Sequence, residues 1–195
     1  MFASPMSSLQ SNPTPTQLFT AEQYYAMPDE GVPTELVRGR IITMPPPGYR
    51  HGFVCGQAVF FLKSYLIQHP IGTAVGNDTG VVTERGPDSV RGPDVSYYSH
   101  ERIPKGQQPV AWPEVSPDLV FEVRSPSDRW PQILRKVSEY LNANVSLVCV
   151  LDPQSQTAHL YRSDEQVRVF GAEEEIVFAP VLPDWRLKVS QFFVE

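Results

Sequence analysis

The chain has 195 residues, and its 41% hydrophobic and 19% charged residues are ordinary values for a globular protein with a sizeable core. A formal net charge of −6 argues against a broad basic surface for unselective nucleic-acid binding, but it is compatible with a local cationic groove or a metal-dependent site. No stretch is long and apolar enough to span a bilayer, and the N-terminus lacks the profile of a signal peptide, so we expect no membrane contact.

The two cysteines and the N-terminal segment bear on location and domain organisation. Cys55 and Cys149 lie in apolar surroundings without a pairing pattern, which indicates reduced core residues of a cytoplasmic protein. Residues 1–18 are rich in Ser, Pro, Gln and Thr and are predicted to be a disordered tail. Residues 19–195 are then expected to form a single domain.

Up to residue 116, hydrophobic periodicity and turn residues predict two helices, a hairpin and further strands. Thr20 can cap the first helix, and an Arg38-Gly39 turn joins the two hairpin strands. The expected elements are a helix at 21–27, strands at 34–37 and 40–44, a long helix at 51–69, strands at 72–75, 80–84 and 95–98, and a loop at 103–116.

The stretch 117–153 is predicted to form a strand, a helix and a second strand. Leu119 to Val123 is a short apolar run, and residues 145–151 are almost fully apolar. Because the two strands are joined by a crossover helix, they are expected to be parallel. The chain is therefore predicted to be an α/β protein with a mixed central sheet flanked by helices. Shorter strands at 159–162, 166–170 and 176–178 and an extended segment at 180–193 complete it.

The helix of this unit is predicted to cover the central sheet with one apolar face. The sequence SPSD offers N-cap residues, and Pro131 suits the first helical turn. Lys136 lies at the edge of the apolar face, from which its amine can reach back toward the sheet. The apolar positions at helical spacing are Ile133, Leu134, Val137, Tyr140 and Leu141.

Glu122 interrupts the central strand, and Arg124 follows two residues later. Their spacing puts both side chains on one face of the strand. A carboxylate in so apolar a run is costly to bury unless it meets a cation or a metal. Asp94, at the start of another strand, is a second carboxylate that can share a hard divalent cation with it. Such a cation activates water and polarises a phosphoryl oxygen, and Lys136 can stabilise the developing charge.

Each of these residues also has an ordinary structural interpretation. A Pro-Asp pair is common in turns, Glu122 and Arg124 can pair with each other, and Lys136 can be a solvated helix residue. His51 and Cys55 stand four residues apart on one helix face, a spacing that can bind a transition metal. Since no second ligand pair is apparent, a histidine at a helix start and a core cysteine are the simpler interpretation.

The order of four segments resembles the Uma family, restriction-endonuclease-like proteins of the PD-(D/E)XK nuclease superfamily. The segments are ELVRGRIITMPPPGYRH, RGPDVSYYS, PDLVFEVRSPSD and, after a helix that contains Lys, VSLVCVLDP. The resemblance covers approximately residues 19–193. It implies a restriction-endonuclease-like core and a Mg²⁺ or Mn²⁺ site with Asp94 and Glu122 as ligands, together with Glu35 and His51 as further site residues.

One position departs from the superfamily pattern, because Arg124 stands where Lys is usual. Arginine does not carry protons near neutral pH, and the resemblance suggests that Lys136 supplies the amine from the helix. Lys136, helped by Arg124, is expected to stabilise the charge on the phosphate, and Glu35 and His51 are expected to orient water or a metal ligand. The sequence thus predicts a homodimeric endodeoxyribonuclease in which Asp94, Glu122 and the Val123 carbonyl hold the metal. A catalytically inactive module that binds DNA or protein is the main alternative, and a structural homodimer is the third.

Overall fold

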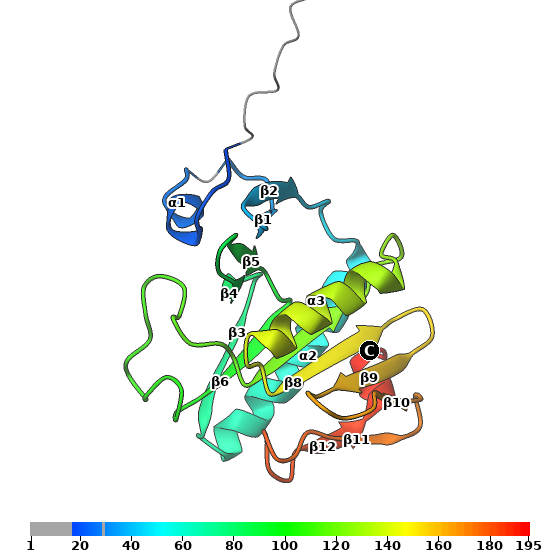
Figure 1. Ribbon diagram of the computed structural model, residues 1–195. Helices are drawn as coiled ribbons and strands as arrows, with labels where there is room; N and C mark the ends of the chain where they lie inside the picture. Colours follow the sequence, from blue (N-terminus) through cyan, green and yellow to red (C-terminus); the bar gives the residue numbers. More distant parts are fainter. Residues whose placement is uncertain (1–16, 29) are drawn as a thin grey trace, which may run out of the picture.

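The computed structural model describes residues 17–28 and 30–195, so residues 1–16 of the predicted tail lie outside the described residues (Figure 1). The helices are α1 (Ala21–Tyr25), α2 (Tyr49–Gln68), α3 (Trp130–Asn142) and the short 3-10 helix η1 (Val189–Phe192). The strands are β1 (Thr34–Val37), β2 (Arg40–Thr43), β3 (Gly72–Gly76), β4 (Val81–Glu84), β5 (Ser89–Arg91), β6 (Val95–Ser99), β7 (Leu119–Val123), β8 (Leu147–Asp152), β9 (Thr157–Tyr161), β10 (Arg168–Phe170), β11 (Glu175–Val177) and β12 (Arg186–Lys188). None of the helices in this part of the chain has the length and apolar character needed to cross a membrane.

The centre of the molecule is a six-stranded mixed sheet in the order β10-β9-β8-β7-β6-β3. The β7 and β8 strands are parallel and joined through α3, as the sequence predicts, and the other neighbours in the sheet are antiparallel. The predicted α/β class with a mixed central sheet is therefore confirmed.

The two faces of this sheet are covered by different helices (Figure 1). Leu119, Phe121 and Val123 of β7 pack in the core that contains the buried face of α2. Val120 packs instead with the buried residues of α3. Since strand side chains alternate, Glu122 leaves on the same face as Val120 and meets α3.

A second sheet, in the order β2-β1-β5-β4, is antiparallel and packs beside α3 through Val81 of β4. Its β1–β2 hairpin turns at Arg38 and Gly39, whose φ angles of 49° and 75° are those of a tight turn. A side chain at Gly39 would meet Leu18, whose Cβ lies 2.7 Å from the ideal Cβ position. The hairpin therefore positions β1, which carries Glu35.

Several local expectations are wrong. The β5 strand falls between the predicted strands at 80–84 and 95–98, where the sequence predicted none, while β12 and η1 replace part of the extended C-terminal segment. The SPSD residues do not cap α3, whose N-cap is Arg129. Instead, the Asp128 carboxylate accepts the N–H of Ser125 and closes the turn after β7. Leu134 is exposed rather than part of the buried face, because the short α3 buries only Ile133, Val137 and Tyr140.

Candidate functional site

The candidate residues come from five segments that meet at one end of the central sheet. Glu35 lies on β1, His51 on the first turn of α2, Asp94 directly before β6, and Glu122 near the end of β7. Lys136 reaches the same place from the middle of α3. The structure thus brings together residues that are up to 101 positions apart in the sequence.

The Glu122 carboxylate is buried, with 4% of the residue exposed. The Tyr140 hydroxyl donates a hydrogen bond of 2.7 Å to Oε1, and the Lys136 amine lies 3.2 Å from Oε2. Burial raises the pKa of Glu122 to about 7 because the cation of Lys136 does not fully offset burial and the neighbouring carboxylate of Asp94. The Glu122 carboxylate therefore has two donors, Tyr140 and Lys136, but their combined effect does not compensate for the free energy of burying its negative charge.

The Lys136 amine is shared between two carboxylates. Its Nζ lies 3.0 Å from Oε1 of Glu35 as well as near Glu122. Burial alone would lower the pKa of Lys136, but Glu122 and Glu35 outweigh it and raise the pKa above its usual value. The predicted direction of this amine toward Glu122 is confirmed, whereas its catalytic role stays a prediction.

Glu35 is held by a second cation that the sequence analysis missed. The Arg91 guanidinium donates a hydrogen bond of 2.7 Å to Glu35 and two bonds of 2.5 and 2.9 Å to Glu139 of α3. Burial alone would raise the pKa of Glu35, but Lys136 and Arg91 outweigh it and keep the pKa low. The Arg-Gly-Pro-Asp sequence that contains Arg91 was the available signal, yet it appeared only to mark a turn.

Asp94 stands opposite Glu122 in the sheet. Val95 pairs with Phe121 in the antiparallel register of β6 and β7, and one further step matches Asp94 to Glu122. The Val123 N–H donates a 2.6 Å hydrogen bond to Oδ2 of Asp94. Because the N–H and C=O of one residue in an extended strand point to the same side, the Val123 carbonyl is expected to face this carboxylate too.

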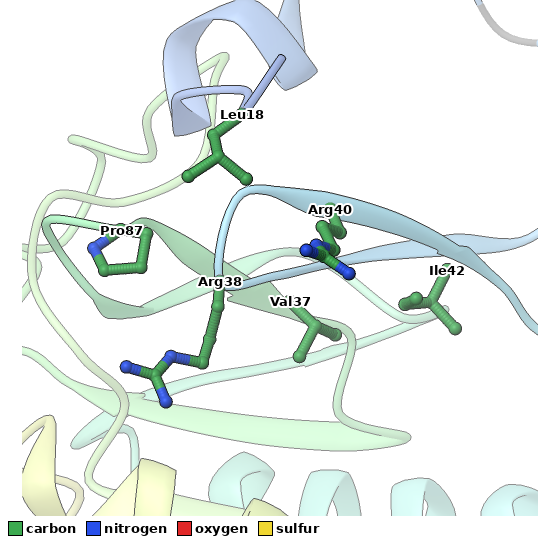
Figure 2. A pocket seen from close by; sticks show the side chains of 6 residues that line it. All are labelled: Leu18, Val37, Arg38, Arg40, Ile42 and Pro87. Atoms are coloured by element: carbon green, nitrogen blue, oxygen red, sulfur yellow. The ribbon is translucent and has the colours of Figure 1, made fainter. Parts of the chain in front are cut away.

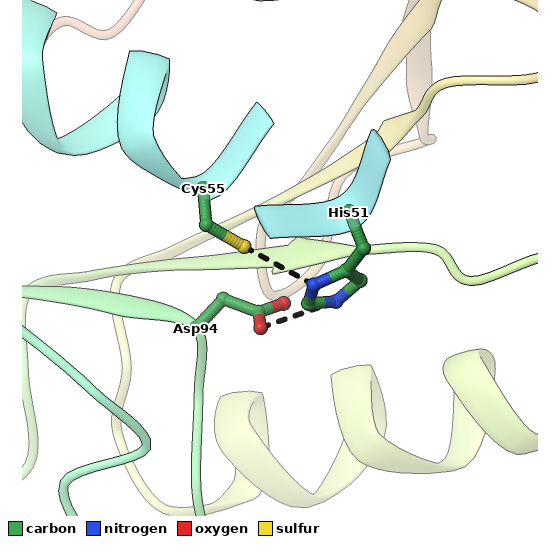
Figure 3. Close-up of side chains that lie close together, drawn as sticks. All are labelled: His51, Cys55 and Asp94. Carbon is green, nitrogen blue, oxygen red and sulfur yellow. Dashed lines mark hydrogen bonds and ion pairs between the residues drawn. The ribbon is translucent and has the colours of Figure 1, made fainter. Parts of the chain in front are cut away.

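The other oxygen of Asp94 contacts α2 (Figure 3). Nε2 of His51 lies 3.3 Å from Oδ1 of Asp94, and Nδ1 of His51 lies 3.4 Å from Sγ of Cys55. Burial by itself would lower the pKa of His51, but the bond to Asp94 outweighs it and raises the pKa. In the part of the chain that the structure describes, this is the only group of three or more His, Cys, Asp or Glu residues with ligand atoms all within 4.8 Å of one another.

A Cys-His-Asp arrangement can also belong to a thiol hydrolase, but its protonation state argues against that chemistry here. Burial and the nearby Asp94 carboxylate raise the pKa of the Cys55 thiol well above its usual value. A nucleophilic cysteine needs the opposite shift, because the thiolate is the reactive form. The raised pKa therefore argues against a nucleophilic thiolate in the protein without metal, whereas a bound metal ion would itself favour the deprotonated sulfur.

Arg124 does not join the Glu122 cluster. Its guanidinium donates a 2.9 Å hydrogen bond to Asp152 of β8 and lies 5.5 Å from the ring centre of Trp130. Burial alone would raise the pKa of Asp152, but the Gln154 N–H and Arg124 outweigh it and lower the pKa. A pair between Glu122 and Arg124, the structural alternative weighed from the sequence, is wrong because Asp152 takes the guanidinium.

Asp78 is another acidic residue that the sequence analysis did not select. It follows β3, with a φ angle of 52°, and lies near Asp94. Burial and the negative charge of Asp94 raise the pKa of Asp78 above its usual value. No periodic pattern marks this residue, because it lies in a turn.

An apolar pocket lies away from these residues. It has a volume of about 420 Å³ and surrounds the hairpin turn, where Leu18 and Pro87 face the side chains of β1 and β2 (Figure 2). Its lining residues are Leu18, Val37, Arg38, Arg40, Ile42 and Pro87. None of the candidate catalytic residues lines it, so the site at the sheet end is a cluster of polar side chains rather than an enclosed apolar cavity.

The oxygen-rich part of the cluster fits a hard divalent cation. By extension of the β6–β7 register, Asp94 and Glu122 occupy opposed positions on neighbouring strands, and the Asp94 carboxylate contributes to the raised pKa of Glu122. Two adjacent, largely buried carboxylates are destabilising without a compensating cation, and the raised pKa of Glu122 reports this cost. The donor set therefore fits Mg²⁺ or Mn²⁺.

Comparisons with known proteins agree with this architecture. The Uma2 family, described as "Putative restriction endonuclease", matches residues 21–190. A crystal structure described as "a putative nuclease belonging to DUF820", from Anabaena variabilis ATCC 29413, is similar with a TM-score of 0.78. The two chains share 20% sequence identity over 90% of this chain and 97% of the other, a likeness that shows the fold. No curated protein matches the chain.

Proposed function

Because this chain belongs to the Uma2 family, we propose that it is a metal-dependent endonuclease that hydrolyses phosphodiester bonds in DNA. The observation that carries the proposal is the meeting of Asp94, Glu122 and Lys136 at one end of the central sheet. Two carboxylates beside one buried amine supply what phosphodiester hydrolysis requires, namely a cation site and a group that stabilises negative charge.

Asp94, Glu122 and the Val123 carbonyl would hold the ion, and Mg²⁺ or Mn²⁺ bound there supplies an activated water and a polarised phosphoryl oxygen. Lys136 would stabilise the negative charge that develops on the phosphate. Tyr140 positions Glu122 through its 2.7 Å hydrogen bond, and the Val123 N–H fixes one oxygen of Asp94. Glu35 would position the Lys136 amine, and His51 would hold the second oxygen of Asp94.

Cleavage of DNA in the presence and absence of metal tests the proposal. The parent protein should cut DNA with Mg²⁺ or Mn²⁺, and a chelator should abolish cleavage. Asp94→Asn and Glu122→Gln should lose cleavage and keep a cooperative unfolding transition, since both replacements preserve the side-chain shape. Asp164→Asn, at an exposed turn position with a φ angle of 62°, is the matched control and should cleave as the parent does.

An inactive module that binds DNA is the second candidate, and the position of Arg124 favours it. The strand lacks a lysine at position 124, and the guanidinium there is occupied by Asp152. Salt-dependent DNA binding without cleavage in Mg²⁺ or Mn²⁺ would support this candidate. A protein that neither binds nor cuts DNA would belong to the third class, structural homodimers.

The DNA phosphates need cations, and two exposed arginines on the hairpin that carries Glu35 provide them. Arg38 lies at the turn and Arg40 begins β2, and both side chains are exposed. We propose that they contact phosphates of the DNA at some distance from the cleaved bond. Replacing both with Ala should weaken DNA binding uniformly across sequences and reduce the salt dependence by about two phosphate contacts. Arg186→Ala on β12, also exposed, is the control.

A homodimer is part of the proposal, and the outer face of α2 is its proposed interface. Tyr49, Phe60 and Ile67 are 84%, 59% and 76% exposed. Their separations of eleven and seven residues put them on one face of the helix. Pairing of two such faces would remove these side chains from water and give two active sites in one assembly.

A further inference from the structure

We propose that His51, Cys55 and Asp94 form a site for a soft divalent cation such as Zn²⁺, distinct from the oxygen-rich site for Mg²⁺ but sharing Asp94 with it. The three side chains would give one imidazole nitrogen, one thiolate sulfur and one carboxylate oxygen. The arrangement is drawn in Figure 3, where Cys55 and Asp94 both face the His51 ring.

The spacing of the ligand atoms supports the site. Sγ of Cys55 lies 3.4 Å from Nδ1 of His51, and one ligand atom from each of the three residues lies within 4.8 Å of the others. Bond lengths of ~2.0 Å to nitrogen or oxygen and ~2.3 Å to sulfur place tetrahedral ligands roughly 3.3–3.5 Å apart. Cys55 contacts Nδ1 of His51 and Asp94 contacts Nε2, so one ion would use a single ring nitrogen, and the side chains would turn to bring all three ligand atoms onto it.

The fold holds these ligands before any ion binds. His51 and Cys55 are four residues apart on α2, so the helix puts them on one face. Asp94 comes from the sheet and is fixed by the Val123 N–H at 2.6 Å. The His51 and Asp94 side chains are each 12% exposed, which leaves access for an ion and for the water that would complete a four-coordinate site.

The sulfur decides which metals the site selects. Thiolate and imidazole prefer Zn²⁺ and similar ions, whereas Mg²⁺ prefers oxygen ligands. On binding, the S–H bond of Cys55 breaks, a sulfur–metal bond forms, and the proton leaves to solvent, with no change of oxidation state. A cysteine that served only for packing would show none of this chemistry.

Sharing of Asp94 makes the two metal sites mutually exclusive. This consequence rests on the proposed function: an ion that takes Asp94 together with His51 and Cys55 removes a ligand from the Mg²⁺ site. Zn²⁺ should therefore prevent Mg²⁺ from binding and should inhibit the nuclease. The soft-metal site itself does not depend on whether the protein cuts DNA.

Titration of the full chain with Co²⁺, a spectroscopic substitute for Zn²⁺, tests the site directly. The parent should bind one equivalent with a thiolate-to-metal charge-transfer band, and Zn²⁺ should displace it. Cys55→Ala should lose the band and bind Zn²⁺ at least ~10-fold more weakly, the lower end of effects on metal sites. Cys149→Ala is the matched control and should keep the band, since Cys149 is fully buried in β8.

Alkylation of Cys55 gives a second measurement, which requires neither the Co²⁺ absorption band nor the variants. Zn²⁺ should protect the partly exposed Cys55 from a thiol reagent in the folded protein, while Mg²⁺ should not. Parent protein without a thiolate band, or a band that persists in Cys55→Ala, would overturn the site even if the protein cuts DNA. A band in a protein that never cuts DNA would leave the site standing and contradict the proposed function instead.

Discussion

At the residue scale, the two cations beside the central strand have different partners. Lys136 contacts Glu122 and Glu35, whereas Arg124 pairs with Asp152 and stacks near Trp130. Lysine at position 136 thus lies where a catalytic amine is useful, and arginine at position 124 links β7 to β8. Substitution of each residue tests whether the two cations have these different roles.

Lys136→Met should reduce DNA cleavage by at least ~100-fold, the scale for loss of a charge-stabilising group. The fold should survive because Arg91 still pairs with Glu35 and because Glu122, whose pKa is already raised to about 7, can take up a proton. Cleavage rates and urea denaturation check the two parts. Unchanged cleavage would show that Lys136 has no catalytic role.

Arg124→Ala, in contrast to Lys136→Met, should affect the stability of the fold more than DNA cleavage. Removing the guanidinium leaves Asp152, 4% exposed, without its cation, and breaking such a pair costs about 3 kcal/mol of unfolding free energy. Urea denaturation measures the loss. A stability equal to that of the parent would mean that the Arg124–Asp152 pair contributes nothing net.

Two buried tyrosines provide a matched test of the hydrogen bond to Glu122. Tyr140→Phe removes a 2.7 Å bond to a carboxylate and should lower the unfolding free energy by about 1.5–3 kcal/mol. The Tyr98 hydroxyl is buried and makes no hydrogen bond of normal geometry among the described residues, although Ser96 is close enough to lower its pKa slightly against the effect of burial. Tyr98→Phe should therefore be neutral or stabilising. Equal losses in both variants would contradict the importance of the Tyr140 bond.

At the element scale, α1 is too short to be stable alone and depends on the small sheet. The Asp88 carboxylate, in the turn between β4 and β5, accepts the N–H of Ala21 at 2.8 Å, the N–H of Gly86 at 3.1 Å and a bond from Arg85 at 2.9 Å. Burial alone would raise the pKa of Asp88, but these donors outweigh it and lower the pKa. The Asp88 side chain thus holds α1 against the small sheet and closes the turn between β4 and β5.

Asp88→Asn should destabilise the protein at neutral pH by about 1–3 kcal/mol, because the carboxylate is the stronger acceptor. An acid whose pKa is lowered by folding stabilises the protein above its unfolded pKa of 3.8, and this stabilisation disappears as pH falls through the lower folded pKa. The gap between parent and variant should therefore close below pH 3.8. Urea denaturation across this range checks it, with Glu114→Gln in the exposed loop as control.

At the scale of the whole molecule, the outer face of α2 carries three exposed apolar side chains, Tyr49, Phe60 and Ile67. Stable interfaces bury about 800 Å² on each partner, which a 20-residue helix with flanking residues can supply. The same helix carries His51 at its start, so pairing along α2 would bring the two sites into one assembly.

Ile67→Glu should shift the proposed dimer to monomer, because two charges would be buried against each other without a partner. Sedimentation of the parent and the variant at several concentrations measures this shift. Val110→Glu in the exposed loop adds the same charge elsewhere and should leave the mass unchanged. A parent that remains monomeric at all concentrations would remove the homodimer from the proposal.

The sequence by itself determined the local structure and several members of the site. Two apolar runs and a helical pattern predicted β7, β8 and α3 and hence the mixed sheet, because these patterns reflect which side chains must leave water. Glu122 attracted notice for the same reason, as a charge in an apolar strand. The position of Lys136 at the edge of the helix face predicted that its amine would reach Glu122.

Only the tertiary structure decided the partners of these charges. Arg91 meets Glu35 across 56 residues, and Arg124 meets Asp152 across 28. Likewise, Cys55 and His51 gained their third neighbour when the sheet brought Asp94 to the start of α2. Local patterns record which face of an element is buried, but the choice among several possible ion partners depends on how strands pair and helices pack, and that is fixed only when the whole chain folds.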